Sequence, residues 1–131
     1  MEVEQRTPNL LLHTCKGIEV ISVHTIVRIE AISNYSKLFF SNGKTLVVAK
    51  LLKWFEEKLA AAQLVRVHKT HLINTNFISQ YVEGAGGKVG LRNGDWVSVS
   101  RRKKAYFIKY WVNVPGLQTG IYIKNKTALV A

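Results

Sequence analysis

Two Asn-Gly pairs constrain the fold of this chain more than any other feature of its sequence. Asn42-Gly43 lies between the strand patterns 37–40 and 45–48, and Asn93-Gly94 leads into a further strand pattern. Asn and Gly best tolerate the positive φ angles of tight hairpin turns, so this dipeptide between alternating apolar residues is a strong local signal for a β-hairpin. The sequence therefore predicts antiparallel pairing between strands that are neighbours in the chain.

Further strand patterns occupy most of the remaining chain. They are short and are separated by polar or glycine-containing turns, and they cover residues 10–13, 18–22, 26–31, 64–68, 78–82, 88–91 and 96–99. In 26–31 the alternation predicts one buried face, formed by Val27, Ile29 and Ala31. Residues 69–76 are expected to form a connection. We therefore expect a mainly β protein of small antiparallel sheets with short helices.

Two segments have helical periodicity instead. Residues 50–61 carry one apolar stripe that is expected to cover the sheet, formed by Leu51, Leu52, Phe55 and Leu59. A second helix is expected over residues 101–112, with Ser100 as its N-cap. Its aromatic face is formed by Tyr106, Phe107, Tyr110 and Trp111. Pro115-Gly116 is expected to end it.

The positive charge is unevenly distributed along the chain. The formal net charge is +11. Residues 1–63 contain eight Lys or Arg and six Asp or Glu, whereas residues 64–131 contain eleven Lys or Arg and two acidic residues, Glu83 and Asp95. The second part therefore has a net charge of +9, against +2 for the first. A basic half whose cations cluster at strand ends points to a polyanionic partner.

Two strand patterns end in cationic residues. The pattern 64–68 runs into His68 and Lys69, and the pattern 96–99 is followed by Ser100 and then by four cations, Arg101, Arg102, Lys103 and Lys104. The guanidinium of Arg101 suits guanine O6 and N7, to which it can donate two parallel bonds. Lys69 and the three cations after Arg101 suit phosphate, and His68 suits a base or a phosphate. Two alternatives stay open, a His68 packed at the strand end and an Arg101 that contacts only phosphate or water.

Patterns for catalysis and metal binding are weak. His68 and His71 form a His-x-x-His motif, but two histidines three apart at a strand end are expected to point in different directions rather than at one zinc ion. Cys15 lies near His13 without a third group to orient a nucleophile. The glycine-rich segment 84–87 lacks the lysine of a phosphate-binding loop. We therefore expect no enzyme, no metal site and no cofactor.

The sequence also predicts where the protein resides. It has no apolar run long enough to span a bilayer, and residues 1–6 are acidic where a signal peptide would be basic. Its lone Cys15 cannot form an internal disulfide, which agrees with a reducing compartment. We expect a soluble cytoplasmic protein without a membrane partner.

Four motifs occur in a fixed order between about residues 10 and 108. They are Ile29-Glu30-Ala31 with Asn34-Tyr35, Leu51-Leu52 with Phe55 and Leu59, Val65-Arg66-Val67-His68-Lys69-Thr70 with Asn74, and Val99-Ser100-Arg101-Arg102. Each is weak alone, but in this order and spacing they form a specific signal. In these motifs the chain resembles a LytTR-type DNA-binding domain, the output module of many bacterial response regulators.

This resemblance implies small antiparallel sheets whose loops and strand ends enter successive major grooves of duplex DNA. It also implies direct-repeat sites and a homodimer on the DNA. Residues 1–112 would form the domain, without a receiver domain, and 113–131 a C-terminal extension with a strand at Gly120–Lys124. The DNA-facing residues carried over by position are Ser36, Lys37, His68, Lys69, Arg101 and Arg102, to which the charge pattern adds Lys103 and Lys104.

The sequence leaves two other functions open. An RNA- or single-strand-binding β module would need exposed aromatic residues on a sheet face, on which bases could stack. The strand patterns predict alternately buried positions instead. A basic interaction protein without sequence specificity is the third function, in which the charge serves docking alone.

Overall fold

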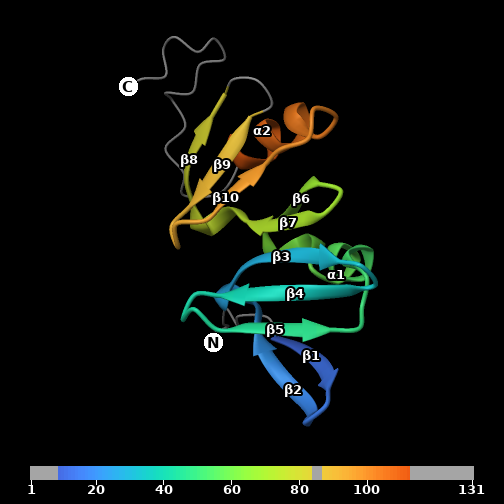
Figure 1. Cartoon of the computed structure of the whole chain (residues 1–131). Coiled ribbons are helices and arrows are strands. Elements are labelled where there is room, and N and C mark those ends of the chain that lie inside the picture. The colour runs from blue at the N-terminus through green and yellow to red at the C-terminus, as the bar shows by residue number, and fades with distance from the viewer. Residues whose placement is uncertain (1–8, 84–86, 113–131) are drawn as a thin grey trace, which may run out of the picture.

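Three antiparallel sheets follow one another along the molecule, with two helices packed against them (Figure 1). The computed structural model describes residues 9–83 and 87–112. This mainly β architecture with short helices confirms the predicted fold class. In chain order the elements are β1 (Asn9–Thr14), β2 (Gly17–Ser22), β3 (Ile26–Ile32), β4 (Tyr35–Phe40), β5 (Thr45–Val48), α1 (Leu52–Lys58), β6 (Leu64–His68), β7 (His71–Asn74), β8 (Ile78–Val82), β9 (Lys88–Leu91), β10 (Trp96–Ser98) and α2 (Lys104–Val112).

Strand pairing follows the chain except at one place. β1 pairs with β2, and β8, β9 and β10 form a three-stranded sheet. The central sheet has the order β5-β4-β3-β7-β6, so that β3 pairs with β7, which lies far from it in the sequence. This pairing brings the end of β3 beside the turn between β6 and β7.

Both Asn-Gly pairs form hairpin turns, as the sequence predicts. The glycine of each pair has the positive φ, 89° at Gly43 and 96° at Gly94. The glycine N–H donates to the carbonyl oxygen three residues earlier, over 2.9 Å in both turns. The asparagine Oδ1 accepts from the amide two residues later, also over 2.9 Å. Each turn is therefore a three-residue loop that ends with glycine in the left-handed region.

β7 is the strand that the sequence analysis missed, because residues 69–76 were expected to form a connection. Its two apolar residues are buried on opposite faces of the sheet. Leu72 belongs to a first core with α1, β1 and β4, and Ile73 belongs to a second core with β9, β10 and α2. A four-residue strand that is buried on both faces has no alternation of apolar and polar residues to reveal it.

β3 also lies between the two cores, and its burial differs from the predicted alternation. A bulge between Ile26 and Arg28 shifts the register with β4. Ile26 therefore shares the first core with Ile29, and Val27 lies in the second core. Both are buried because β3 is covered on both faces. The buried Asn74 joins these strands, since its Nδ2 donates to the Ile26 carbonyl oxygen over 2.9 Å. This hydrogen bond gives Asn74 a structural role within the central sheet.

Both helices are shorter than predicted. α1 lies within the expected range 50–61, and a 3-10 turn follows it at Ala60–Ala62. α2 begins at Lys104 rather than at residue 101, because residues 101–103 form a turn. Ser100 caps this turn, since its Oγ accepts a hydrogen bond from the Lys103 N–H over 3.2 Å.

α2 packs on the second core with only part of its predicted aromatic face. Phe107 is fully buried and stacks on Trp111, with 5.8 Å between the ring centroids. Tyr106 lies on the exposed side of the helix. The helix is therefore anchored to the second core through Phe107 and Trp111.

Among the described residues, no helix is long and apolar enough to cross a membrane. The predicted extension 113–131, with its strand at Gly120–Lys124, lies outside the described residues. The same holds for residues 84–86 of the glycine-rich segment.

Candidate nucleic-acid interface

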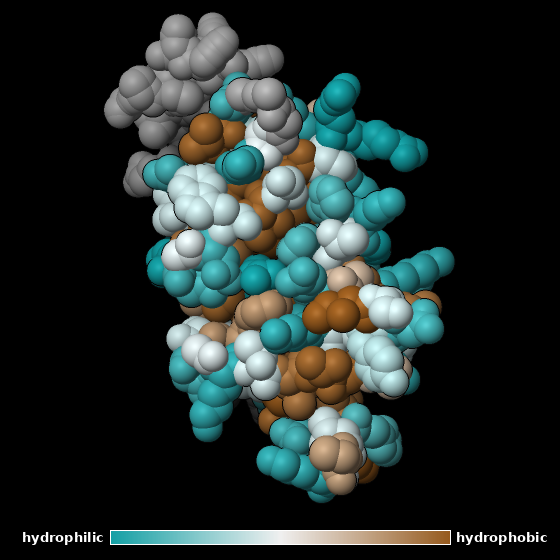
Figure 2. Space-filling view, in the orientation of Figure 1, coloured by the Kyte–Doolittle hydropathy of each residue, from teal (hydrophilic) through white to brown (hydrophobic). Residues whose placement is uncertain are grey.

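Three turns lie along one edge of the molecule, at the right in Figure 1. They are the β3–β4 turn (33–34), the β6–β7 turn (69–70) and the turn before α2 (101–103). Two backbone hydrogen bonds connect them. The Ala31 N–H donates to the Thr70 carbonyl oxygen over 2.9 Å, and the Ser100 N–H donates to the Val67 carbonyl oxygen over 2.8 Å. Figure 2 shows hydrophilic side chains projecting from this edge.

Arg66 on β6 holds the central turn in place. Its Nε donates to the carbonyl oxygen of His68 over 3.0 Å, and its Nη2 donates to that of Lys69 over 2.6 Å. Its Nη1 forms an ion pair with Glu56 of α1 over 2.7 Å. This role of Arg66 is not among those predicted from the sequence. Its position two residues before His68, on the same face of the strand, was the available signal.

Four of the predicted residues converge around one groove, which has a volume of about 860 Å³. The groove lies between the β6–β7 turn and the start of α2. Its walls are formed by Glu56, Arg66, His68, Lys69, Ser100, Arg102, Lys103 and Tyr106. Glu56 is its only acidic residue and is paired with Arg66, so the remaining charge of the groove is positive. Such a surface attracts an anion.

The other two cations of the run have different surroundings. Arg101 is exposed beside the groove rather than in its wall. Lys104 forms an ion pair with Glu83 over 3.3 Å. This contact connects α2 to the end of β8, so Lys104 has a structural partner as well as the predicted phosphate role.

Of the two residues predicted to face DNA from the β3–β4 hairpin, Ser36 is buried and Lys37 is partly exposed. The Ser36 side chain is fully buried, and its Oγ donates to the Lys50 carbonyl oxygen over 2.7 Å. Ser36 therefore stabilises the hairpin and is not available to DNA, because strand alternation turns it inward. Its neighbour Tyr35 is 49% exposed. Lys37 is half-buried opposite Glu30.

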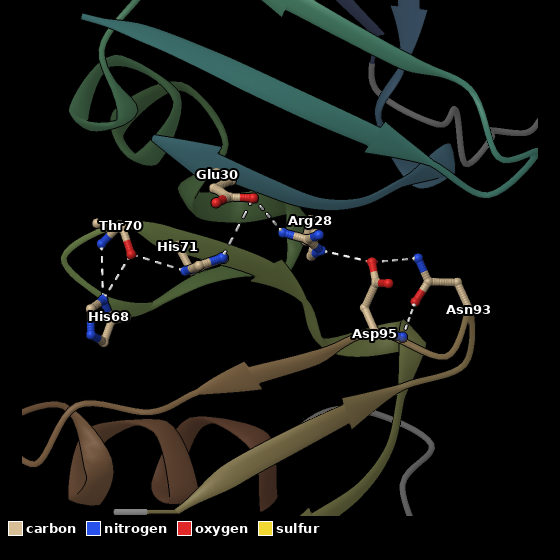
Figure 3. A network of polar contacts seen from close by, with 7 residues as sticks. All are labelled: Arg28, Glu30, His68, Thr70, His71, Asn93 and Asp95. Carbon is tan, nitrogen blue, oxygen red and sulfur yellow. Dashed lines mark hydrogen bonds and ion pairs between the residues drawn. The ribbon is translucent and has the colours of Figure 1, made fainter. Parts of the chain in front are cut away.

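A polar network runs from the β9–β10 turn to the β6–β7 turn (Figure 3). Arg28 on β3 is its centre. The guanidinium lies 3.7 Å from the centroid of the Phe39 ring, and it forms ion pairs with Asp95 over 2.8 Å and with Glu30 over 3.1 Å. Glu30 Oε1 in turn lies 4.0 Å from His71 Nε2. The sequence predicts an exposed face for Arg28 and Glu30, whereas in the structure both are partly buried and Arg28 bridges to the turn between β9 and β10.

His68 and His71 also belong to this network, and they do not point apart as predicted. The Thr70 hydroxyl lies between them, 2.9 Å from His68 Nδ1 and 3.0 Å from His71 Nδ1. The two ring centroids are 6.2 Å apart. The register shift between Arg66 and His68 explains the convergence, because it places His68 directly opposite His71 in the β6–β7 pair.

Burial and charge shift the pKa of two groups in the network. Burial lowers the pKa of His71 below its ordinary value, and the opposing effect of Glu30 only partly offsets it, while Arg28 and His68 lower it further. For Asp95, burial would raise the pKa, but hydrogen bonds from Arg28 and Asn93 and the charge of Arg28 together hold it below its ordinary value.

The lowered pKa of His71 predicts that the protein becomes less stable as the pH is lowered. The unfolded chain takes up a proton near the ordinary value of about 6.5, whereas the folded protein resists that proton until a lower pH. The free energy of unfolding should therefore decrease as pH falls through 6.5 and level off below the folded-state pKa. Denaturant titration over this range should give a flatter profile for His71→Gln. His13→Gln is the control, and equal profiles for all three proteins would contradict the prediction.

The described residues contain no group of three or more His, Cys, Asp or Glu side chains that could hold a metal ion. Cys15 is exposed in the turn between β1 and β2. The cations around the groove supply hydrogen-bond donors and positive charge.

Comparison with known proteins shows the family and the fold of the chain. The family model of the LytTr DNA-binding domain matches residues 16–111. A solved structure, the LytTr DNA-binding domain of a Bacillus cereus protein described as a methyl-accepting/DNA response regulator, has a TM-score of 0.68 at 22% identity and is similar over 78% of this chain and 94% of that one. No curated protein gives a significant match. The chain belongs to the LytTR family of DNA-binding domains, which are found in transcription regulators.

Proposed function

We propose that this protein binds duplex DNA in a sequence-specific manner and thereby regulates bacterial transcription. The observation that carries this proposal is the convergence of His68, Lys69, Arg102 and Lys103 around one groove. These residues come from two segments that are about thirty positions apart in the chain, and the bond between Ser100 and Val67 holds the segments together. The three turns of this edge would enter successive major grooves.

The geometry supports different roles for the side chains of this edge. Arg101 is exposed and carries a forked guanidinium, so it is proposed to contact a guanine edge. Lys69, Arg102 and Lys103 are proposed to contact phosphates, which position the protein on the duplex. Lys37 and Lys104 lie at the margins and are proposed to add long-range attraction.

The wider setting of the protein is also a proposal. The similar Bacillus cereus domain comes from a protein described as a response regulator, which supports a role in a two-component system. We propose direct-repeat sites, a homodimer on the DNA and a cytoplasmic location. Residues 1–112 are proposed to form the DNA-binding domain and 113–131 an extension of it.

The described residues do not favour an RNA- or single-strand-binding module. Such a module stacks bases on aromatic residues that share one sheet face. The large aromatic side chains exposed in the described chain are Tyr35 on β4, Trp96 on β10 and Tyr106 on α2. They belong to two different sheets and a helix, and so provide no common platform.

We expect binding to be strongly dependent on salt. If the edge neutralises about six phosphates, log K should fall with log salt at a slope near −5. Lys69→Ala should reduce this slope by about 1. Lys16→Ala removes an equal charge from the β1–β2 turn and should leave the slope unchanged. Fluorescence anisotropy at several salt concentrations measures these slopes, and a slope shallower than about −2 for the wild type would contradict the proposed contact surface.

A further inference from the structure

We propose that Thr70 is a positioning residue, which fixes His68 in the tautomer with hydrogen on Nε2 and so makes this ring a hydrogen-bond donor to DNA. Only the role of His68 as a donor to DNA rests on the proposed function. The state of the ring itself follows from contacts within the β6–β7 turn.

The backbone amide of Thr70 determines the role of His68 Nδ1. The Thr70 N–H points at this atom over 3.2 Å. A backbone amide can only donate, so Nδ1 must accept. A neutral imidazole carries one hydrogen, and it therefore lies on Nε2. The backbone fixes the direction of the Thr70 N–H, so the role of Nδ1 follows without an assumed position of a ring hydrogen.

The Thr70 hydroxyl forms a second hydrogen bond in which His68 Nδ1 is again the acceptor. Its Oγ1 lies 2.9 Å from His68 Nδ1. Since Nδ1 has no hydrogen to give, the hydroxyl must donate to it. The oxygen then accepts from His71 Nδ1, which is 3.0 Å away. One hydroxyl thus sets the hydrogen positions of both rings, and His71 Nε2 is left facing Glu30 at 4.0 Å.

The backbone around His68 is held on both sides, so the ring keeps its position. Arg66 donates to the carbonyl oxygens of His68 and Lys69. The Thr70 carbonyl oxygen accepts from the Ala31 N–H over 2.9 Å. His68 lines the groove beside Arg102 and Lys103. A rigid ring in such a place can present one donor in a defined direction.

An Nε2–H donor selects the atoms it can contact. It can bond guanine O6 or N7, thymine O4 or a phosphate oxygen, but it opposes the amino groups of adenine and cytosine. A ring with hydrogen on Nδ1 would instead present an acceptor at Nε2 and reverse this preference. The tautomer therefore decides which partner the turn accepts.

The ring is tested first without DNA. A long-range proton–nitrogen correlation spectrum of the folded protein at about pH 8 reports the tautomer of each histidine. We expect His68 to carry its hydrogen on Nε2. A spectrum with hydrogen on Nδ1, or an equal mixture, would overturn the proposal. Thr70→Val keeps the amide and the branched shape, and it should reduce the Nε2–H population, whereas Thr70→Ser should preserve it.

DNA binding then tests the donor. His68→Gln places an amide donor near the position of Nε2, and His68→Asn places one near that of Nδ1. His68→Gln and Thr70→Ser should retain most of the affinity for the preferred duplex, whereas His68→Asn and Thr70→Val should lose roughly three- to tenfold. Equal losses for His68→Gln and His68→Asn would refute the donor role, and an unchanged Thr70→Val protein would refute the part assigned to the Thr70 hydroxyl.

The loss of affinity on different duplexes identifies the DNA group that accepts the hydrogen bond from His68. A loss confined to the preferred duplex and to one base pair indicates a base edge, and an equal loss on every duplex indicates a phosphate. A wild-type protein that binds no duplex would refute the proposed function and the donor role together. The tautomer spectrum would still decide whether Thr70 fixes the ring.

Discussion

Arg101→Ala is expected to lower affinity for the preferred duplex by about 1–3 kcal/mol, or roughly 5- to 150-fold, and to relax the preference at one base pair. The reason is the forked guanidinium, which can donate two parallel bonds to a guanine edge. Arg101 is exposed directly after the capping residue Ser100, so its side chain is free to enter a groove. Electrophoretic mobility or anisotropy on the preferred and shuffled duplexes measures the effect.

Two further variants separate base reading from charge. Arg101→Lys keeps the positive charge but loses the fork, and it should lose most of the specificity while retaining affinity for shuffled duplexes. Lys103→Ala should weaken binding to both duplexes by similar factors, because a phosphate contact carries no sequence information. Equal loss on both duplexes for Arg101→Ala would contradict its assignment to a base.

Phe107→Ala is expected to destabilise the protein by about 3–5 kcal/mol, since it removes a large side chain from the second core. Phe107 is fully buried, and its ring lies 5.7 Å from that of Tyr81 and 5.8 Å from that of Trp111, between centroids. Its N–H also donates to the Lys103 carbonyl oxygen over 2.8 Å. Loss of this packing should release the start of α2 from β6 and weaken DNA binding as well.

Chemical denaturation measures the change in the free energy of unfolding. Leu11→Ala is the control, because it also shortens an apolar side chain but at an exposed position of β1. It should change stability by no more than about 0.5 kcal/mol. A similar small change for Phe107→Ala would show that α2 does not depend on the second core.

The parts of the fold that were predictable are those with local causes. Asn42-Gly43 and Asn93-Gly94 revealed their hairpins because turn geometry depends on a few adjacent residues. Ser100 was recognisable as a cap for the same reason. The basic edge could be predicted because cations follow two strand patterns, and because the order of the motifs resembled one family.

The parts that escaped prediction depend on contacts between distant segments. β7 was hidden because each of its apolar residues enters a different core. Arg28 was expected to face solvent, but it meets Asp95, which lies 67 positions later in the chain. Ser36 was carried over by position to the DNA side, yet its hydroxyl is used by the Lys50 carbonyl oxygen. Neither periodicity nor motif spacing contains such pairings.

The most direct test of the central claim is competition for the protein between duplex DNA, single strands and RNA at one salt concentration. A duplex obtained by selection from random sequences would be labelled, and the same duplex, a shuffled duplex, each single strand and an RNA of the same sequence would compete. Sequence-specific duplex binding predicts that the selected duplex competes at concentrations roughly a thousandfold lower than the shuffled one, and that single strands and RNA compete no better than the shuffled duplex. Equal competition by the shuffled duplex, or stronger competition by RNA or a single strand, would contradict it.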